Sequence, residues 1–223
     1  MIYKRNWDKS YKKKENTLFY PDEYLIRFVN KYIKKRQKLI VKNTNYKFLD
    51  IGCGIGRNVK YLVENGFKVT GIDISTVAIN NAKKFLNFKK VNKSRYSLFN
   101  LSSTSFIRKQ KKFDAVISCA TLDSMPTIEI DATIKNVKDV LRKNGFFYLD
   151  LMSINQKRKG KFINKYDQLV NETHETGTIQ SYWDMKRINL KFKDFKKIDI
   201  KKITTFNNKK IINERFYCVF RKF

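Results

Sequence analysis

Short apolar runs alternate with amphipathic segments along residues 46–151 of the chain. The first run, residues 46–51, has the length and composition of a buried strand. The segment after it places Val59, Leu62 and Val63 on one face of a helix. Similar patterns predict strands at residues 69–73, 95–99 and 113–118, and a helix at residues 76–86. This alternation predicts an α/β fold with a parallel, doubly wound sheet.

The segments on either side of this region carry signals of their own. Pro21, Asp22 and Glu23 indicate the start of a helix, because proline and acidic residues are favourable in a first turn. Beyond the region, the patterns predict a helix at residues 185–195, an alternating apolar segment at residues 198–203 and a strand at residues 216–220. Residues 152–178 form a connection longer than usual, and we expect them to be a substrate-binding loop.

The turn after the first strand contains three glycines spaced by two, at positions 52, 54 and 56. A strand, a glycine turn and a helix together bring backbone atoms close to a ligand. The spacing differs from a dinucleotide fingerprint, because Arg57 occupies the place of its third glycine. The phosphate loop of NTPases is excluded too, because it needs Gly-Lys-Ser/Thr where this chain has Gly-Arg-Asn. Asp50, two residues before the turn, would repel a phosphate and attract an ammonium group.

The pattern Asp-x-Gly-x-Gly-x-Gly resembles motif I of the class I S-adenosylmethionine (SAM)-dependent methyltransferases. Asp73 ends the second predicted strand, where a carboxylate can accept hydrogen bonds from both ribose hydroxyls of an adenosine. The resemblance implies SAM as the cofactor and a seven-stranded, Rossmann-like sheet closed by an antiparallel hairpin. The cofactor-binding residues that it implies are Asp50, Gly52, Cys53, Gly54, Gly56, Asp73, Ile74, Asn100, Leu101 and Cys119.

Within that set, the glycine turn and Asp50 would hold the methionine end, Asp73 the ribose, and Asn100 with Leu101 the adenine. The family usually has an aspartate where this chain has Asn100, which can still accept through its amide oxygen. The segment after the fourth strand resembles motif IV of the small-molecule enzymes, and residues 140–149 resemble the family's fifth strand. We therefore expect a helical arm or cover at residues 1–40 and the methyltransferase domain at residues 41–223.

Two residues are candidates for a catalytic role. His174, the one histidine of the chain, has an ordinary pKa suited to a general base and lies between Glu172 and Glu175. The alternative is a solvent-exposed loop histidine. Asp123 follows the fourth strand and would face the methyl group in this fold, whereas the alternative is a helix or turn cap. A base is needed only when the acceptor is a hydroxyl or a protonated amine.

Four other side chains are more ambiguous. Trp7 and Tyr11 could cover the cofactor, since an aromatic face attracts a sulfonium, but packing of a helix on the core is the favoured interpretation. Arg27 could reach a carboxylate of the cofactor, and a surface ion pair is favoured instead. Cys119 is interpreted as a small buried residue whose backbone lines the site.

The formal net charge is +29, from 49 Lys and Arg against 20 Asp and Glu. Such a charge fits attraction to RNA, acidic membranes or an anionic substrate, but the lysines are spread along the chain, which favours a compositional origin. Since no run of about 18 apolar residues occurs, we expect no membrane span. The N-terminus has no apolar signal region, and three scattered cysteines form no metal spacing. These features indicate a cytoplasmic protein without a metal site.

The function predicted from the sequence is methyl transfer from SAM to a small molecule or a carbohydrate-type acceptor, which could be anionic. One rival is an RNA or protein methyltransferase, which the net charge of +29 would suit. The turn after the fourth strand, Ser118-Cys119-Ala120-Thr121, differs from the Asn/Asp-Pro-Pro-aromatic turn of enzymes that methylate exocyclic amines of bases. A second rival is a non-catalytic protein that binds SAM.

Overall fold

The computed structural model describes residues 2–13, 17–35, 44–106, 112–156, 158–208 and 210–223. These residues form a seven-stranded sheet in the order β3-β2-β1-β4-β5-β10-β9. Strands β1 to β5 are parallel, and β10 pairs antiparallel with both β5 and β9. The strands are β1 (Lys47–Ile51), β2 (Lys68–Asp73), β3 (Tyr96–Asn100), β4 (Phe113–Ser118), β5 (Leu141–Met152), β9 (Lys196–Asn207) and β10 (Lys210–Arg221). The predicted doubly wound sheet with an antiparallel hairpin is confirmed.

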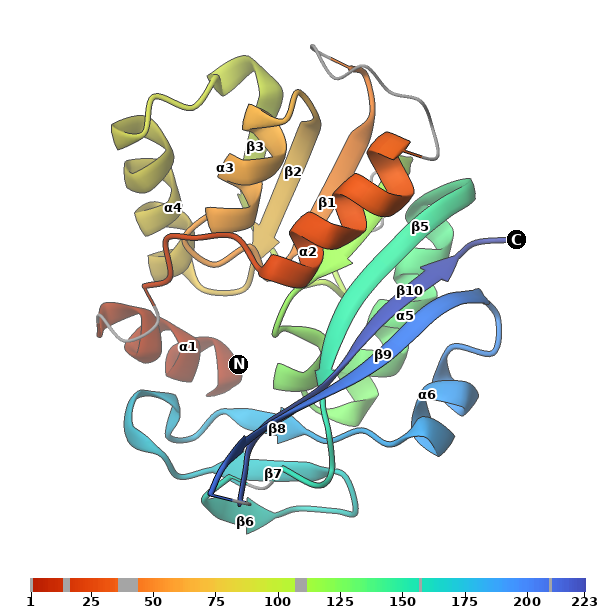
Figure 1. The fold of residues 1–223 in the computed structure, drawn as a ribbon. Helices are drawn as coiled ribbons and strands as arrows, with labels where there is room; N and C mark the ends of the chain where they lie inside the picture. The colour runs from red at the N-terminus through yellow and green to blue at the C-terminus, as the bar shows by residue number, and fades with distance from the viewer. Residues whose placement is uncertain (1, 14–16, 36–43, 107–111, 157, 209) are drawn as a thin grey trace.

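Helices cover both faces of this sheet (Figure 1). Those that precede or connect the first strands are α1 (Ile2–Lys12), α2 (Glu23–Phe28), the π-helix η2 (Val29–Lys35), α3 (Arg57–Glu64), α4 (Thr76–Phe88) and the short η3 (Lys93–Arg95). Those later in the chain are η5 (Leu122–Ser124), α5 (Thr127–Val140), η6 (Thr173–Glu175) and α6 (Met185–Lys191). In the described residues, no helix is long and apolar enough to span a membrane.

The central strands are apolar on both sides because two separate cores lie against the sheet. Along β5, Phe146 and Tyr148 belong to one core, and Phe147 and Leu149 belong to the other. Helices α2, η2, α3 and α4 fill the first core, whereas α5 and α6 contribute to the second. This alternation explains why the β-strands were readable as continuous apolar runs in the sequence.

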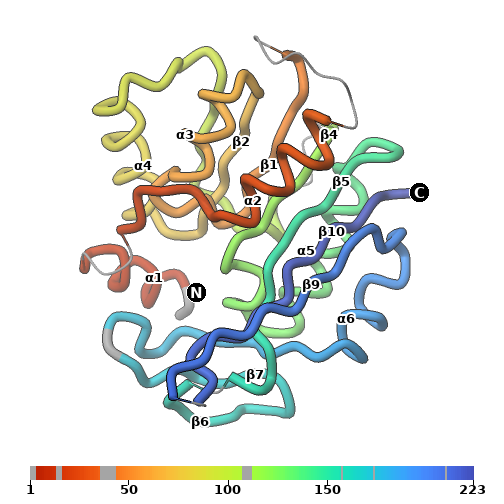
Figure 2. The backbone as a smooth tube through the Cα atoms, in the orientation of Figure 1, coloured from red at the N-terminus to blue at the C-terminus, as the bar shows by residue number. Residues whose placement is uncertain are grey.

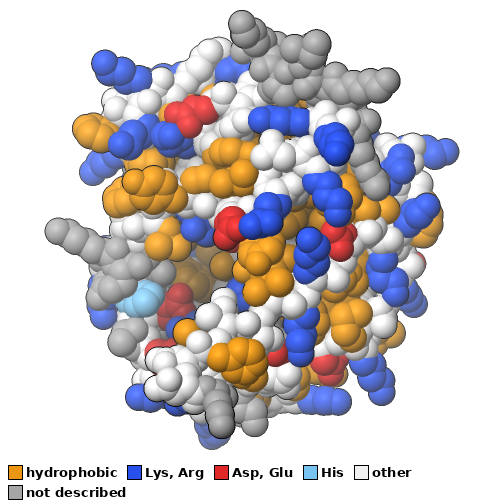
Figure 3. Space-filling view, viewed as in Figure 1, with side chains coloured by type: hydrophobic (Ala, Val, Ile, Leu, Met, Phe, Trp, Pro, Cys, Tyr) orange, Lys and Arg blue, Asp and Glu red, His pale blue; other side chains and the backbone are white. Residues whose placement is uncertain are grey.

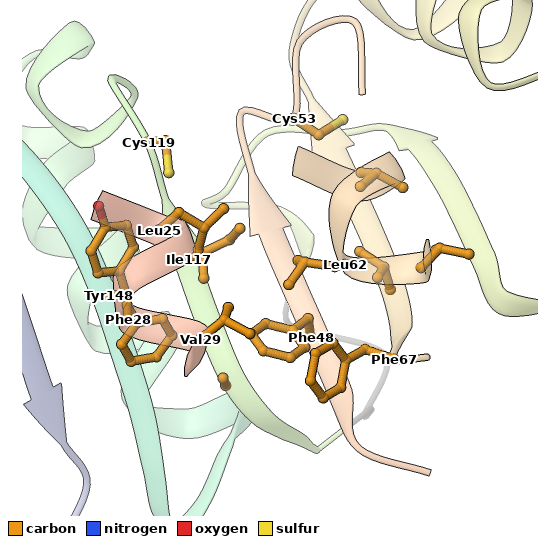
Figure 4. Packing of buried hydrophobic residues seen from close by; sticks show 14 of the residues in the cluster. Leu25, Phe28, Val29, Phe48, Cys53, Leu62, Phe67, Ile117, Cys119 and Tyr148 are labelled. Atoms are coloured by element: carbon orange, nitrogen blue, oxygen red, sulfur yellow. The ribbon is translucent and has the colours of Figure 1, made fainter. Parts of the chain in front are cut away.

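Helix α2 begins where the sequence predicts, and Asp22 is its N-cap, accepting a hydrogen bond of 2.9 Å from the Leu25 amide. The same carboxylate accepts a hydrogen bond of 2.9 Å from the Tyr148 hydroxyl of β5. Leu25, Phe28 and Val29 lie on the sheet, with the Phe28 ring stacked on Tyr148 at 5.0 Å between centroids (Figure 4). Residues 23–35 are thus part of the core, and the predicted boundary at residues 40–41 lies outside the described residues.

Residues 152–178 are not one long loop. They contain β6 (Gly160–Phe162) and β7 (Asp167–Val170), which form a three-stranded antiparallel sheet with β8 (Ile179–Ser181). Asp167 attaches this sheet to α5, because its carboxylate accepts hydrogen bonds of 3.0 and 2.8 Å from the Thr127 amide and hydroxyl. Strands this short leave no readable alternation in the sequence, and their pairing depends on such tertiary contacts.

The α6 helix is also shorter than predicted. It ends at Lys191, and Phe192 and Phe195 continue as a turn whose rings fill the second core. The small sheet and α1 lie at the same end of the central sheet, as the backbone trace shows (Figure 2). They therefore stand beyond the carboxyl ends of the parallel strands, where ligands bind in this architecture.

We expect Phe28→Ala to lower the free energy of unfolding by about 3–5 kcal/mol, because a large ring that is 2% exposed leaves a cavity in the first core. The matched control is Phe88→Ala, whose ring is 76% exposed and whose loss should change stability by less than about 0.5 kcal/mol. Urea unfolding followed by circular dichroism measures both. Equal effects of the two substitutions would contradict the assignment of α2 to the core.

Candidate active site

A cleft lies at the carboxyl ends of β1 and β4, the two neighbouring strands from which the chain leaves in opposite directions. It holds about 1350 Å³ of space when the open solvent at its mouth is included. Its walls come from the glycine turn, the tips of β2 and β4, helix α1, the small sheet and β10.

The glycine turn requires its glycines for steric reasons. Gly52 has φ +68°, and a Cβ there would lie 2.2 Å from the Thr121 hydroxyl. Gly54 has φ +53°, and a Cβ there would lie 2.8 Å from the Tyr11 hydroxyl. The backbone of the turn thus lies so close to the side chains of Thr121 and Tyr11 that only glycine fits. Gly56 is the N-cap of α3, and in contrast to Gly52 and Gly54 it is not part of the cleft lining.

The amides of this turn already have acceptors inside the protein. Those of Gly52 and Cys53 both donate to the Ile72 carbonyl, at 2.8 and 3.0 Å, and the Gly56 amide donates to the Cys53 carbonyl at 2.9 Å. The Gly54 amide donates to Asp73 at 2.9 Å. A phosphate cradle needs amides that are free to point at the ligand, so this turn does not suit a nucleotide phosphate.

Asp73 joins the turn to the next helix. Its Oδ2 accepts the hydrogen bond from Gly54, and its Oδ1 accepts one of 2.8 Å from the Ser75 amide. Ser75 in turn caps α4 by accepting from the Ala78 amide at 3.1 Å, as predicted. Burial raises the pKa of Asp73 to about 6, an effect that outweighs the two hydrogen bonds to its charged form. Asp73 and the adjacent Ile74 both line the cleft.

Asp50 lies behind the turn rather than in the cleft lining. It is 1% exposed, and neither of its carboxylate oxygens has a hydrogen-bond partner among the described residues. Burial raises its pKa to about 8; the nearby Arg57 opposes this rise, whereas Asp73 adds to it. A buried carboxylate with this pKa is largely neutral at pH 7, and a cation placed near it would lower that pKa and restore its charge.

Asn100 is exposed and does not line the cleft, although the next residue, Leu101, does. Its amide nitrogen donates to the carbonyls of Asp73 and Ile74 at 3.0 and 2.9 Å, and its oxygen accepts from Thr76 at 2.9 Å. An ionised aspartate could not donate the first two bonds. Asparagine at this position therefore ties β3 to the tip of β2.

The thiols of Cys53 and Cys119 are both buried at the cleft, and burial raises their pKa well above the usual range. Such thiols are protonated and act as small apolar groups. After Cys119 the backbone turns at Ala120, which has φ +50° and donates to the Asp150 carboxylate at 2.6 Å. This contact joins the tip of β4 to β5.

Asp123 lines the cleft but is not a free carboxylate. Its Oδ2 accepts hydrogen bonds from the Met152 amide at 2.9 Å and from Arg215 at 2.5 Å, whereas its Oδ1 is buried without a partner among the described residues. Arg215, on β10, also donates to Asp150 at 2.6 Å. Burial raises the pKa of Asp123, and Arg215 opposes that rise. This cluster could not be predicted from the sequence, because its members lie on η5, β5 and β10, far apart along the chain.

His174 lies in η6, outside the residues that line the cleft. Its Nε2 is 3.7 Å from the Glu175 carboxylate. Glu172 and Glu175 both form ion pairs with the Arg158 guanidinium. Arg158 and Glu175 line the cleft together with Gln180. A role of His174 as a base stays a prediction.

Helix α1 forms the remaining wall. Trp7 and Tyr11, 6.2 Å apart between ring centroids, both line the cleft, in addition to packing against each other. The helix is held by Asn6, which donates to the Gly177 carbonyl at 2.6 Å, and by Asp8, which accepts from the Ser75 hydroxyl at 2.7 Å. Arg27 lies elsewhere and forms the expected exposed ion pair, with Glu23 at 2.5 Å.

Comparison with known proteins identifies the family. The model of a methyltransferase domain matches residues 49–147. An uncharacterised methyltransferase of Schizosaccharomyces pombe is 30% identical over 112 residues, which are 50% of this chain and 74% of the relative. This chain belongs to the class I SAM-dependent methyltransferases. SAM is the cofactor of this family.

Other similarities agree with this assignment. The methyltransferase is 32% identical over 146 residues to a ubiquinone biosynthesis O-methyltransferase of Pelagibacter ubique, covering 64% of this chain and 58% of the relative. The chain spans about half the length of the first curated relatives it matches. A SAM-dependent methyltransferase structure from Methanosarcina mazei has a TM-score of 0.68 at 23% identity, with 86% of this chain and 97% of the other covered. That likeness shows the shared fold.

We expect Arg215→Met to lower the free energy of unfolding by about 3–5 kcal/mol at pH 7, because it leaves two buried carboxylates without a counter-charge. The loss should shrink as the pH falls toward 5. Without the guanidinium, which opposes the rise in the Asp123 pKa caused by burial, the folded-state pKa of Asp123 rises further, so the native state binds more protons than the unfolded chain.

The matched control is Arg221→Met on the same strand, whose guanidinium makes an exposed hydrogen bond to the Asn144 carbonyl and should contribute less than about 0.5 kcal/mol. Urea unfolding at several pH values measures both variants. A loss in Arg215→Met that does not depend on pH would contradict the proposed origin of its effect.

Proposed function

We propose that this methyltransferase transfers the methyl group of SAM to a small molecule bound in the same cleft. The observation that carries the proposal is the continuity of the cleft, which extends from Asp73 and the glycine turn to Gln180 and Arg215. One part of its wall is the region matched by the family model, and the other part comes from the small sheet and β10. Donor and acceptor can therefore share one enclosed space.

The residues present fit the cofactor. Asp73 would accept hydrogen bonds from the ribose, Ile74 and Leu101 would contact the adenine, and the turn at Gly52 and Gly54 would support the methionine end. Asp50 supports this orientation, because it is buried behind that turn and its carboxylate has no hydrogen-bond partner among the described residues. A cation on the turn would be a positive partner for the carboxylate and would favour its ionised form. When bound, SAM supplies a methyl group already activated on a sulfonium sulfur.

Transfer is a displacement at the methyl carbon. A lone pair of the acceptor forms the new bond, the carbon–sulfur bond breaks, and its electron pair stays on sulfur. The protein's main contribution is alignment, which can amount to about 7–11 kcal/mol of the barrier. Helix α1 and the small sheet, which both contribute to the cleft wall, would exclude water from the site.

We assign Asp123 a positioning role, since its carboxylate accepts hydrogen bonds from Arg215 and from the Met152 amide at the end of β5. Its second oxygen is buried, so direct proton transfer from an acceptor would need a movement of this cluster.

The distribution of charge supports a small acceptor over a nucleic acid. Lysine and arginine side chains are scattered over the visible face and interrupted by apolar and acidic groups (Figure 3). Among the described residues, no lysine lines the cleft. Recognition of a polynucleotide backbone favours a continuous basic surface that leads to the site.

We expect Asp73→Ala to weaken SAM binding about 10- to 100-fold, because hydrogen bonds to a charged acceptor contribute about 1.5–3 kcal/mol each. Isothermal titration calorimetry measures the affinity. The control is Asp199→Ala, which removes a carboxylate on β9 that pairs with Lys31 of η2. Since Asp73 also holds the turn, Asp73→Asn serves as a milder variant, and circular dichroism checks that both are folded. Unchanged affinity in both variants would remove the ribose assignment.

The affinity for SAM should rise between pH 5 and 6, by up to about tenfold per unit, because the Asp73 pKa of about 6 leaves the carboxylate protonated at the lower pH. Only its ionised form accepts two ribose bonds. The same calorimetric titration repeated across this range tests the slope. Asp73→Asn should flatten it, and a slope retained in that variant would assign the titration to another group.

A further inference from the structure

The far part of the cleft has an unusual charge for this protein. We define the acceptor wall as the lining residues contributed by η5, the first turn of α5, residues 158–181 and β10. Its charged members are Asp123, Glu129, Arg158, Glu175 and Arg215. The two arginines would suit an anionic acceptor if their charges were available.

Neither arginine is available in this sense. Arg158 forms ion pairs with both Glu172, at 2.9 Å, and Glu175. Arg215 forms ion pairs with both Asp123 and Asp150, at 2.5 and 2.6 Å. Each guanidinium is therefore held between two carboxylates, and each group of three carries a formal charge of −1.

Glu129 adds a further negative charge. Its side chain makes no hydrogen bond or ion pair with the described residues, and burial raises its pKa. Asp123 contributes an independent observation, because its side chain is 2% exposed and its Oδ1 has no hydrogen-bond partner among the described residues, although its Oδ2 pairs with Arg215. The Glu129 carboxyl group thus has no positive partner among the described residues, and Asp123 shares the Arg215 guanidinium with Asp150.

The wall and its ion-pair partners therefore hold five carboxylates against two guanidinium groups. The chain has only 20 acidic residues and a net charge of +29, so a quarter of its acids gather at this one place. The excess of lysine in the composition explains the positive charge of the exterior, but it does not explain a negatively charged wall. The negative charge of the wall is therefore a property of the site.

We propose that the acceptor carries a positively charged group, an ammonium or a guanidinium, which the acceptor wall holds near Glu129. This inference rests on the proposed methyl transfer and replaces the anionic acceptor considered from the net charge. A carboxylate or phosphate there would face like charges at short range, and this repulsion weakens binding. A cation would pair with Glu129 and leave both arginine clusters intact.

SAM analogues with a changed alkyl group test the sign of the wall directly. In three such analogues the methyl group on sulfur is replaced by 3-aminopropyl, n-butyl or 2-carboxyethyl, which extend into the acceptor space as a cation, a neutral chain and an anion. Calorimetry at physiological salt should show the aminopropyl analogue binding about tenfold more tightly than the carboxyethyl analogue, with the butyl analogue between them.

Variants identify the residue responsible. Glu129→Gln should reduce the ratio of the two affinities about threefold, and Glu129→Lys should bring it to one or reverse it. The matched control is Glu64→Gln, which removes an exposed carboxylate that pairs with Lys60 on α3 and should leave the ratio unchanged. Circular dichroism and binding of SAM itself show that each variant is folded.

The outcomes separate this inference from the function beneath it. If SAM itself does not bind the unmodified protein, the proposed function fails and the inference fails with it. If SAM binds but the carboxyethyl analogue binds as tightly as the aminopropyl analogue, or more tightly, only the inference is overturned. A preference for the aminopropyl analogue that Glu129→Lys does not change would also overturn the role given to Glu129.

Discussion

The site depends on the position of one carboxylate, that of Asp73. It holds the Gly54 amide on one side and the Ser75 amide on the other, so a single side chain fixes the glycine turn after β1 and the start of α4. Ser75 then contacts Asp8 of α1. Three walls of the cleft are therefore connected through a few hydrogen bonds. The same carboxylate faces the ligand space, so its structural role and its proposed binding role cannot be separated by position.

Much of the fold could be predicted because its strands and helix starts are marked by residues that are close together in the sequence. Strands buried on both faces leave apolar runs, and the N-caps Asp22 and Ser75 mark helix starts by residue type. The small sheet could not be predicted this way. Its three-residue strands β6 and β8 show no alternation, and contacts such as those of Asp167 with Thr127 join residues 40 positions apart.

The candidate site could be predicted only in part, because some of its contacts join residues that are far apart in the sequence. Asp50, the glycines and Asp73 lie within one motif-bearing segment, whereas Arg215 meets Asp123 across 92 positions. No spacing rule links such distant residues. Glu175 lies 3.7 Å from the His174 imidazole, as its position in the sequence suggested, but Glu172 and Glu175 also pair with Arg158, a partner that the sequence did not indicate.

The division of the cleft has an evolutionary consequence. The family model ends at residue 147, and Arg158, Gln180 and Arg215 all lie after it. Under the proposed function, mutation after residue 147 can change Arg158, Gln180 and Arg215 while the glycine turn stays intact, whereas Asp123 and Glu129 of the acceptor wall lie inside the matched region. A relative that shares only residues 49–147 need not share the acceptor.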